Sequence, residues 1–211
     1  ERIRDVQLEH IGSFSINENE ASKSNIENMI GAVQVPVGIA GPIKIGGEFA
    51  QGEYYLPLAT TEGAQVASVN RGCSAISVSG GTVVRVFNEV MTRAPVFRMN
   101  DINHAKEFVD WIKDGDVFEQ IQNKASETTR FGKLTGVEPY VLGNNVYLRF
   151  EFDTKDAMGM NMVTIATQAI VDLLSDEFGV YPVSLSGNMC SDKKPAAINN
   201  IKGRGKTVVV E

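Results

Sequence analysis

The sequence has few of the residues that build metal sites and disulfide frameworks. Its 211 residues include two cysteines, Cys73 and Cys190, and two histidines, His10 and His104, which lie far apart in the sequence. Two thiols supply neither a disulfide scaffold nor a set of zinc ligands. The composition therefore predicts no metal site and a reducing, cytoplasmic setting.

Long apolar runs and blocks of basic charge are also missing. The apolar stretch over residues 30–42 is interrupted by Gln34 and two prolines, and it is far too short to span a membrane. The first residues are charged and lack the apolar segment of a signal peptide. A formal net charge of −6 argues against a nucleic-acid partner. The sequence leaves open whether a membrane anchor precedes Glu1 in the intact protein.

What remains is an ordinary globular composition, with 43% hydrophobic and 22% charged residues. A chain of this length can bury a sizeable core as one large domain or two small ones. It begins without methionine and ends on the strand-like residues 208–211. We therefore expect a piece of a longer protein.

Periodicity and turn residues predict mixed α and β structure. Helices are expected over 22–30, from about Glu62 to the break at Ser79, and over 104–113, 117–131 and 157–178. Strands are expected over 33–42, 43–45, 53–58, 83–90, 96–99, 137–142, 146–152 and 181–185, and again near the end of the chain. The elements between residues 95 and 184 form a small α+β domain that is inserted into a larger one.

The stretch over residues 186–199 reads Ser-Gly-Asn-Met-Cys-Ser-Asp-Lys-Lys-Pro-Ala-Ala-Ile-Asn. It opens with turn residues and closes with Pro195, which suits the first turn of a helix. Lys193 and Lys194 would be unfavourable there, because the positive end of a helix dipole attracts anions. Asp192 could compensate, and so could a bound carboxylate, phosphate or developing oxyanion. A solvated lysine-rich loop is the alternative.

A second segment, Thr60-Thr61-Glu62-Gly63, predicts a helix start, with a threonine N-cap and Glu62 in the first turn. The carboxylate could merely favour the helix dipole, or it could donate a proton. A dipole lowers the pKa of a carboxyl group at a helix start, whereas burial raises it. The sequence leaves this balance open.

Residues 156–162 form a third segment, with Asp156 as a helix N-cap and Gly159 allowing close approach to the backbone. Free amides at a helix start suit a pyrophosphate; the alternative is a capped core helix whose methionines fill gaps. No Gly-x-Gly-x-x-Gly follows a strand, which argues against a Rossmann fold. Residues 203–207 imitate the end of a phosphate-binding loop, but Asn200 stands where its first glycine belongs.

These segments resemble the hydroxymethylglutaryl-coenzyme A reductase family, in the class I form shared by eukaryotes and archaea. The match covers residues 186–199, Thr-Thr-Glu-Gly with the following Ala-Ser-x-Asn-Arg-Gly, Asp-Ala-Met-Gly-Met-Asn, and Thr129-Arg130-Phe131. The resemblance implies a large substrate-binding and coenzyme A-binding domain that starts over 1–94 and returns over 185–211. It also implies an inserted ferredoxin-like small domain that binds NADP over 95–184.

The resemblance further implies a reaction, in which two NADPH molecules reduce hydroxymethylglutaryl-coenzyme A to mevalonate. Lys193 would stabilise the oxyanion and Glu62 would act as general acid. The acyl group would be held by Arg93, Ser186, Asp192 and Lys194, and coenzyme A by Ser68, Asn70 and Arg71. NADPH would contact Arg130, Phe131, Asp156, Met158, Gly159, Met160 and Asn161, with Arg130 at the 2′-phosphate.

Relatives also use an aspartate and a histidine that would lie beyond Glu211, and their sites form between two subunits. We therefore expect a homodimer, and residues 1–211 alone to be inactive or nearly so. Two other functions stay open. The chain could bind nucleotide or coenzyme A without chemistry, or it could be an acyltransferase with Cys190 as nucleophile, activated by Lys193.

Overall fold

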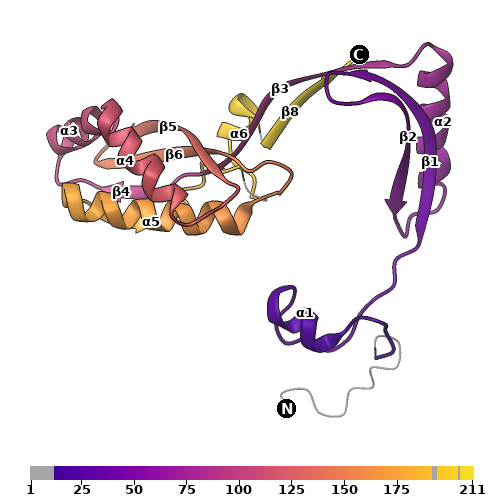
Figure 1. Cartoon of the computed structure of the whole chain (residues 1–211), viewed down its shortest axis with the longest axis horizontal. Coiled ribbons are helices and arrows are strands. Elements are labelled where there is room, and N and C mark those ends of the chain that lie inside the picture. Colours follow the sequence, from indigo (N-terminus) through magenta and orange to yellow (C-terminus); the bar gives the residue numbers. More distant parts are fainter. Residues whose placement is uncertain (1–11, 192–193, 204) are drawn as a thin grey trace. The chain divides into compact units, whose positions relative to one another are not determined.

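A computed structural model describes residues 12–191, 194–203 and 205–211 (Figure 1). Helices and strands alternate along the chain, which confirms the predicted α+β class. The chain divides into two compact units, Glu1–Val83 and Val84–Glu211. Within the described residues, no helix combines the length and the apolar character needed to cross a lipid bilayer.

The first unit is built on a hairpin of β1 (Val37–Gly47) and β2 (Gln51–Ala59), which pair antiparallel. The sequence predicted a strand over 33–42 that ends at a glycine–proline corner. That prediction is wrong at both ends, because β1 begins at Val37 and continues past the corner. Gly41 has a φ of +112°, and its N–H donates to the side-chain oxygen of Asn70 at 2.9 Å. This hydrogen bond supports the irregular backbone inside the strand.

Helix α2 (Gln65–Val78) packs against β1. A Cβ at Gly38 would lie 3.0 Å from Val66 Cγ2, so the strand and the helix approach closely there. Ser77 Oγ accepts a hydrogen bond from the Lys44 N–H at 3.0 Å. Small and polar side chains therefore fix this helix on the hairpin.

The first helix, α1 (Glu18–Ser24), lies earlier in the chain than the predicted span of 22–30. The side chain of Asn17 caps its start by accepting a hydrogen bond from the Glu20 N–H at 3.3 Å. Asn28, inside the predicted span, has a φ of +52°. A left-handed residue there is incompatible with a continuing helix.

An antiparallel sheet forms the base of the second unit. β6 (Asn145–Asp153) pairs with β5 (Lys133–Leu142) along one edge. Its other edge pairs first with the end of β3 (Thr82–Arg93) and then with β4 (Val96–Arg98). Because β4 also pairs with β7 (Tyr181–Ser184), the strand order is β5-β6-β4-β7.

The chain returns to β3 after β7. A short helix, α6 (Ile198–Lys202), precedes β8 (Gly205–Val210), which pairs antiparallel with β3. The strand predicted near the end of the chain is therefore present, and it begins at Gly205, inside residues 203–207. Pro195 lies before α6 and not in its first turn, which corrects the prediction from the sequence.

Helices α3 (Ile102–Ile112) and α4 (Gly115–Ser126) have aspartate N-caps that the sequence interpretation missed. Asp101 accepts hydrogen bonds from two first-turn N–H groups of α3, at 2.8 and 2.9 Å. Asp114 caps α4 by accepting one hydrogen bond, from the Asp116 N–H at 2.9 Å. The predicted helix over 117–131 is five residues too long at its C-terminal end, because α4 ends at Ser126 and its hydrogen bonds give way to a turn.

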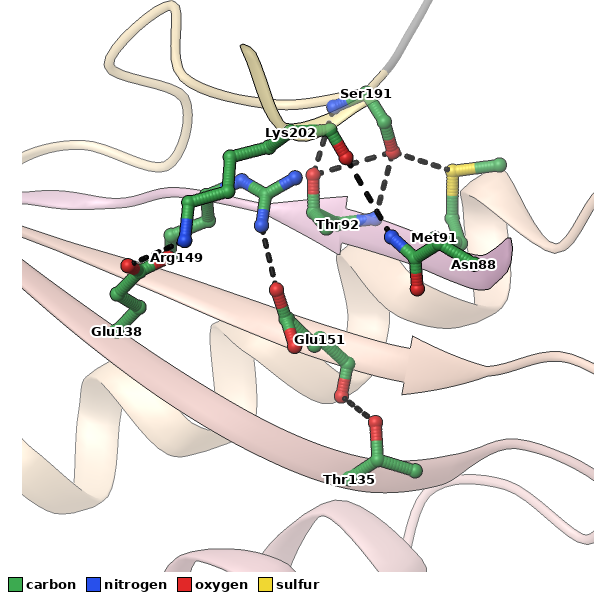
Figure 2. Close-up of polar contacts among 9 residues, drawn as sticks. All are labelled: Asn88, Met91, Thr92, Thr135, Glu138, Arg149, Glu151, Ser191 and Lys202. Atoms are coloured by element: carbon green, nitrogen blue, oxygen red, sulfur yellow. Dashed lines mark hydrogen bonds and ion pairs between the residues drawn. The ribbon is translucent and has the colours of Figure 1, made fainter. Parts of the chain in front are cut away.

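The hydrophobic core of the second unit lies between β6 and the helices α3, α4 and α5 (Met160–Phe178). Alternation along β6 directs Leu148 and Phe150 to this core. Arg149 and Glu151 therefore lie on the opposite face of the sheet. Glu138 of β5 lies on the same face as Arg149 and contacts Lys202 of α6 (Figure 2).

Candidate functional site

A cavity of about 900 Å³ lies in the second unit, between the end of β3, the segment that leads into α5, and the chain that returns after β7. Its size suits a substrate or a cofactor fragment. The lining residues are Glu89, Val90, Met91, Arg93, Phe152, Thr154, Lys155, Asp156, Ala157, Met158, Met160, Asn161, Ser191, Lys194 and Gly205.

Residues predicted for two different tasks share this cavity. Arg93 and Lys194 were predicted to hold an acyl group, and they line it together with predicted cofactor residues, namely Asp156, Met158, Met160 and Asn161. These residues come from β3, the start of α5 and the loop before α6. The structure thus gathers three distant parts of the sequence around one space.

The start of α5 differs from the prediction, and the difference determines which groups are available to bind an anion. The helix begins at Met160, with Gly159 as its N-cap at a φ of +77°, so Asp156 is not the cap. Thr154 causes the difference, because its hydroxyl donates to the Ala157 carbonyl at 2.7 Å and forms a turn. No side chain among the described residues caps the first turn, so its backbone N–H groups are available to a ligand.

Arg93 is anchored to the first turns of α5. Its Nη2 donates to Thr164 Oγ1 at 2.6 Å, and Thr164 Oγ1 donates to the Met160 carbonyl at 2.7 Å. Arg93 closes β3, where it pairs with Phe150 of β6. The guanidinium group is therefore positioned by both a strand and a helix.

The loop over residues 186–191 is fixed to the end of β3. The Gly187 N–H donates to the Ala94 carbonyl at 2.7 Å. A Cβ at Gly187 would collide with Val96 and lie 2.6 Å from Tyr147 Cδ1, so only glycine fits there. Further along, Ser191 exchanges hydrogen bonds with Thr92 (Figure 2).

Cys190 is a structural residue of this loop, 2% exposed. Its Sγ accepts a hydrogen bond from the Ala94 N–H at 3.2 Å and lies 3.1 Å from Ser186 Oγ. Its carbonyl accepts from Asn199 Nδ2 at 3.1 Å. The predicted acyl-group residue Ser186 thus contacts the cysteine and does not line the cavity. A buried thiol in this role is poorly placed to attack a substrate.

Asp192 and Lys193 lie outside the described residues. Their neighbours on both sides, Ser191 and Lys194, line the cavity. Glu62 lies in the first unit, so the convergence of Lys193 and Glu62 on one carbonyl carbon stays a prediction.

The first unit carries the other predicted residues. Glu62 is exposed and does not lie in a helical turn, because α2 begins at Gln65 after a left-handed N-cap residue, Ala64. Ser68 and Arg71 are exposed one turn apart on α2. Asn70 supports β1 through its hydrogen bond to Gly41. The predictions of a threonine N-cap and of Glu62 in the first helical turn are therefore wrong. Thr60 Oγ1 accepts a hydrogen bond from the Glu62 N–H at 3.0 Å, but this contact lies in a turn before the helix.

Arg130 and Phe131 are exposed in the loop between α4 and β5, and neither lines the cavity. Thr129 Oγ1 shapes this loop by accepting hydrogen bonds from the N–H groups of Phe131 and Gly132. A Cβ at Gly132 would lie 3.0 Å from the sulfur of Met162 in α5. The loop therefore lies against the first turn of α5, beside the cavity.

The polar face of the sheet carries an ion-pair network (Figure 2). Glu138 of β5 pairs with Lys202 of α6 at 2.8 Å, and buried Arg149 pairs with Glu151 at 2.6 Å. Burial acts to raise the pKa of Glu138, but the Lys202 ammonium, the Tyr140 hydroxyl and Arg149 outweigh it and hold that pKa below its usual value. Burial, followed by the Glu138 carboxylate, raises the pKa of Tyr140 to about 12.

The sequence interpretation missed two residues that line the cavity, Lys155 and Glu89, and it missed Thr164, which contacts the cavity residue Arg93. Lys155 precedes the recognised Asp156 motif, and its φ of +53° is unusual for a side chain of this size. Asp153 binds the Lys155 ammonium at 2.5 Å and raises its pKa. Glu89 could have been suspected only from its place near the end of β3. No sequence pattern pointed to Thr164, because its hydrogen bond with Arg93 forms only in the folded chain.

Comparisons with known proteins identify the family of the chain. The chain matches the family model described as hydroxymethylglutaryl-coenzyme A reductase over residues 1–211. It is 55% identical over 213 residues to the 3-hydroxy-3-methylglutaryl-coenzyme A reductase of Pyrococcus abyssi, covering 100% of this chain and 52% of that protein. It is 47% identical over 186 residues to 3-hydroxy-3-methylglutaryl-coenzyme A reductase 1 of Dictyostelium discoideum, covering 88% of this chain and 33% of that protein.

Among solved structures, the fold is similar to the class II 3-hydroxy-3-methylglutaryl-CoA reductase from Streptococcus pneumoniae bound to NADPH in open conformations. The TM-score is 0.66 at 20% sequence identity, covering 82% of this chain and 47% of that one. The chain spans about half the length of the archaeal relatives it matches.

Proposed function

Because the chain belongs to the hydroxymethylglutaryl-coenzyme A reductase family, we propose that the protein of which it forms part reduces hydroxymethylglutaryl-coenzyme A to mevalonate and coenzyme A. One observation carries this proposal. The cavity places Arg93 and Lys194, which suit an acyl carboxylate, beside the free amides at the start of α5, which suit a nucleotide phosphate.

The cofactor in this proposal is NADPH, which supplies hydride when bound. The residues present fit a dinucleotide. The first turn of α5 offers backbone N–H groups without a side-chain cap among the described residues, and Gly159 leaves its backbone accessible. Arg130, in the loop against α5, would pair with a 2′-phosphate, and Phe131 would cover a ring through its exposed face.

Each remaining residue has a task that suits its chemistry. Lys193 would stabilise the oxyanion that forms at the attacked carbon, and a preorganised donor of this kind lowers a barrier by about 3 to 4 kcal/mol. Glu62 would donate a proton to the product oxygen. Arg93, Asp192 and Lys194 would orient the acyl group together with Ser186, which precedes Asp192 and Lys194 in the sequence. Ser68, Asn70 and Arg71 would face coenzyme A.

The proposal extends to the organisation of the protein. Residues 1–94 and 185–211 would belong to a large domain, with a ferredoxin-like cofactor domain over 95–184 inserted between them. The antiparallel order β5-β6-β4-β7, with helices packed against β6, supports this division. About 50% identity to archaeal relatives supports a class I enzyme. A cytoplasmic homodimer with a shared active site completes the proposal.

The alternatives predict different results. An acyltransferase that uses Cys190 would lose its activity in the Cys190→Ala variant, whereas a reductase should retain most of it, because the thiol is buried and structural. A module that only binds nucleotide or coenzyme A would hold NADPH and never oxidise it. Burial of the Cys190 thiol argues for the reductase.

The decisive experiment follows the absorbance of NADPH when the full-length protein meets hydroxymethylglutaryl-coenzyme A. We expect two NADPH oxidised per mevalonate formed, and loss of turnover with retained NADPH binding in Lys193→Met. Residues 1–211 alone should bind NADPH and turn over little or no substrate. Unchanged turnover in Lys193→Met would contradict the mechanism, and absence of NADPH oxidation by the full-length protein would contradict the function.

A further inference from the structure

Thr92 of β3 and Ser191, which lines the cavity, are both buried and exchange hydrogen bonds (Figure 2). The Thr92 N–H donates to Ser191 Oγ at 2.8 Å, and the Ser191 N–H donates to Thr92 Oγ1 at 2.8 Å. The Thr92 hydroxyl also donates to Ser191 Oγ at 3.1 Å, and the Ser191 hydroxyl donates to the sulfur of Met91 at 3.4 Å. Thr92 is 0% and Ser191 5% exposed, so water cannot replace these partners.

Thr92 and Ser191 each lie directly before residues of the proposed substrate site. The two residues are 99 positions apart in the sequence. Thr92 immediately precedes Arg93, and Ser191 immediately precedes Asp192 and Lys193. The pair therefore joins the strand that carries one proposed substrate residue to the loop that carries the others.

Neighbouring contacts extend the same connection. The Ala94 N–H donates to Cys190 Sγ, and the Gly187 N–H donates to the Ala94 carbonyl. In the described part of the loop these contacts hold the backbone and the thiol, whereas the Thr92–Ser191 contacts hold the residue that directly precedes Asp192 and Lys193. Each hydroxyl satisfies a buried N–H of the other residue, so the loss of one hydroxyl leaves a buried donor unpaired.

We propose that Thr92 and Ser191 are positioning residues for the reduction, acting through Arg93 and Lys193 and not by touching substrate. The pair holds Ser191 against β3 beside Arg93, two residues before Lys193 in the sequence, and so restricts where the chain that continues to Lys193 can begin. A donor displaced from its working position loses much of its effect on the transition state. This inference depends on the proposed reductase function.

The test uses the full-length protein with three variants and one control. Thr92→Val keeps the shape and removes the hydroxyl, Thr92→Ser keeps the hydroxyl, and Ser191→Ala removes the partner. The control is Thr167→Val, because Thr167 is also 0% exposed and its hydroxyl has no hydrogen-bond partner among the described residues. For each protein the readouts are kcat, KM for both substrates, NADPH dissociation constant, thermal unfolding and amide exchange over residues 187–191.

We expect Thr92→Val to lower kcat about tenfold or more, with the NADPH dissociation constant unchanged within about twofold. Amide exchange at Ser191 should accelerate in the same variant. Thr92→Ser should restore both properties, and Thr167→Val should leave both unchanged. If Thr92→Val does not fold, Ser191→Ala serves instead, with the same expected loss of kcat.

Three results would overturn the inference. One is a Thr92→Val or Ser191→Ala protein with normal kcat; another is a Thr92→Ser protein as impaired as Thr92→Val. The third is a loss of kcat that merely follows the folded fraction, with unchanged exchange at Ser191. If the wild-type protein oxidises no NADPH, the proposed function itself fails and the inference falls with it, which is a distinguishable outcome.

Discussion

Arg93 of β3 donates a hydrogen bond to Thr164 of α5 at 2.6 Å, and this contact ties the proposed acyl-carboxylate residue to the cofactor helix. The acceptor is itself fixed, because the Thr164 hydroxyl donates to the Met160 carbonyl one turn earlier. A shift of α5 would therefore move the guanidinium group as well. The proposed acyl-carboxylate site and the proposed cofactor site therefore share the Thr164 hydroxyl.

The Thr164→Val variant tests that contact. Removal of the hydroxyl frees Arg93 Nη2 to reorient, and we expect KM for hydroxymethylglutaryl-coenzyme A to rise about 5- to 10-fold, corresponding to roughly 1 to 1.4 kcal/mol. KM for NADPH should change much less. Thr164→Ser, which keeps the hydroxyl, is the control and should match the wild type within about twofold. Equal KM values in the valine and serine variants would show that the contact is not used.

Glycines at the two ends of α5 offer a matched comparison. Gly159 and Gly179 both have left-handed φ values, +77° and +69°, but only Gly159 is crowded, with Thr154 Cγ2 at 2.5 Å from an added Cβ. We expect Gly179→Ala to cost about 1 kcal/mol in free energy of unfolding, and Gly159→Ala about 2 to 4 kcal/mol. Urea unfolding measures the difference. NADPH affinity should fall only in Gly159→Ala, and equal costs at both ends would contradict the crowding argument.

The Glu138–Lys202 ion pair makes a pH-dependent contribution to stability. The folded-state pKa of Glu138 lies below its ordinary value of 4.5, so the stabilisation is present above that value and is lost as the pH falls through the lower folded-state pKa. Because both side chains are more than a third exposed, we expect Glu138→Gln to cost only about 0.2 to 1 kcal/mol at neutral pH. Urea unfolding of both proteins at neutral and strongly acidic pH checks this. A difference that persists in acid would point to packing and not to charge.

Tyr140 reports on the same carboxylate. Its pKa of about 12 arises first from burial and then from Glu138, so removal of the negative charge should lower the value while burial keeps it above 10.0. An absorbance titration of tyrosinate in wild-type and Glu138→Gln proteins, with Tyr140→Phe to assign the signal, measures this shift. An unchanged titration in Glu138→Gln would mean that burial acts alone.

Much of this structure could be predicted from local sequence patterns. The strands predicted over 137–142 and 146–152 correspond to β5 and β6. Motif resemblance also selected Arg93, Asp156, Met158, Met160, Asn161 and Lys194, which the structure places around one cavity. These signals are local, because periodicity and turn chemistry act over a few residues.

Other features depended on contacts between distant parts of the chain. Asp156 is a good N-cap by type, but the Thr154 hydroxyl and the left-handed Gly159 move the start of α5 four residues downstream of it. Glu62 follows two threonines, which predict a helix start at that point. Ala64 adopts the left-handed conformation instead, and α2 begins only at Gln65. The hydrogen bonds between Thr92 and Ser191 join residues 99 positions apart, and no local sequence pattern at either residue predicts them.

The hydrogen bond from Gly187 to Ala94 closes a long excursion of the chain. It brings the two ends of residues 95–186 to adjacent backbone positions, 2.7 Å apart from nitrogen to oxygen. The last residues of β3 pair with β6, which lies inside this excursion. Deletion of the excursion would therefore remove both the strand partner of Arg93 and its hydrogen-bond acceptor, Thr164.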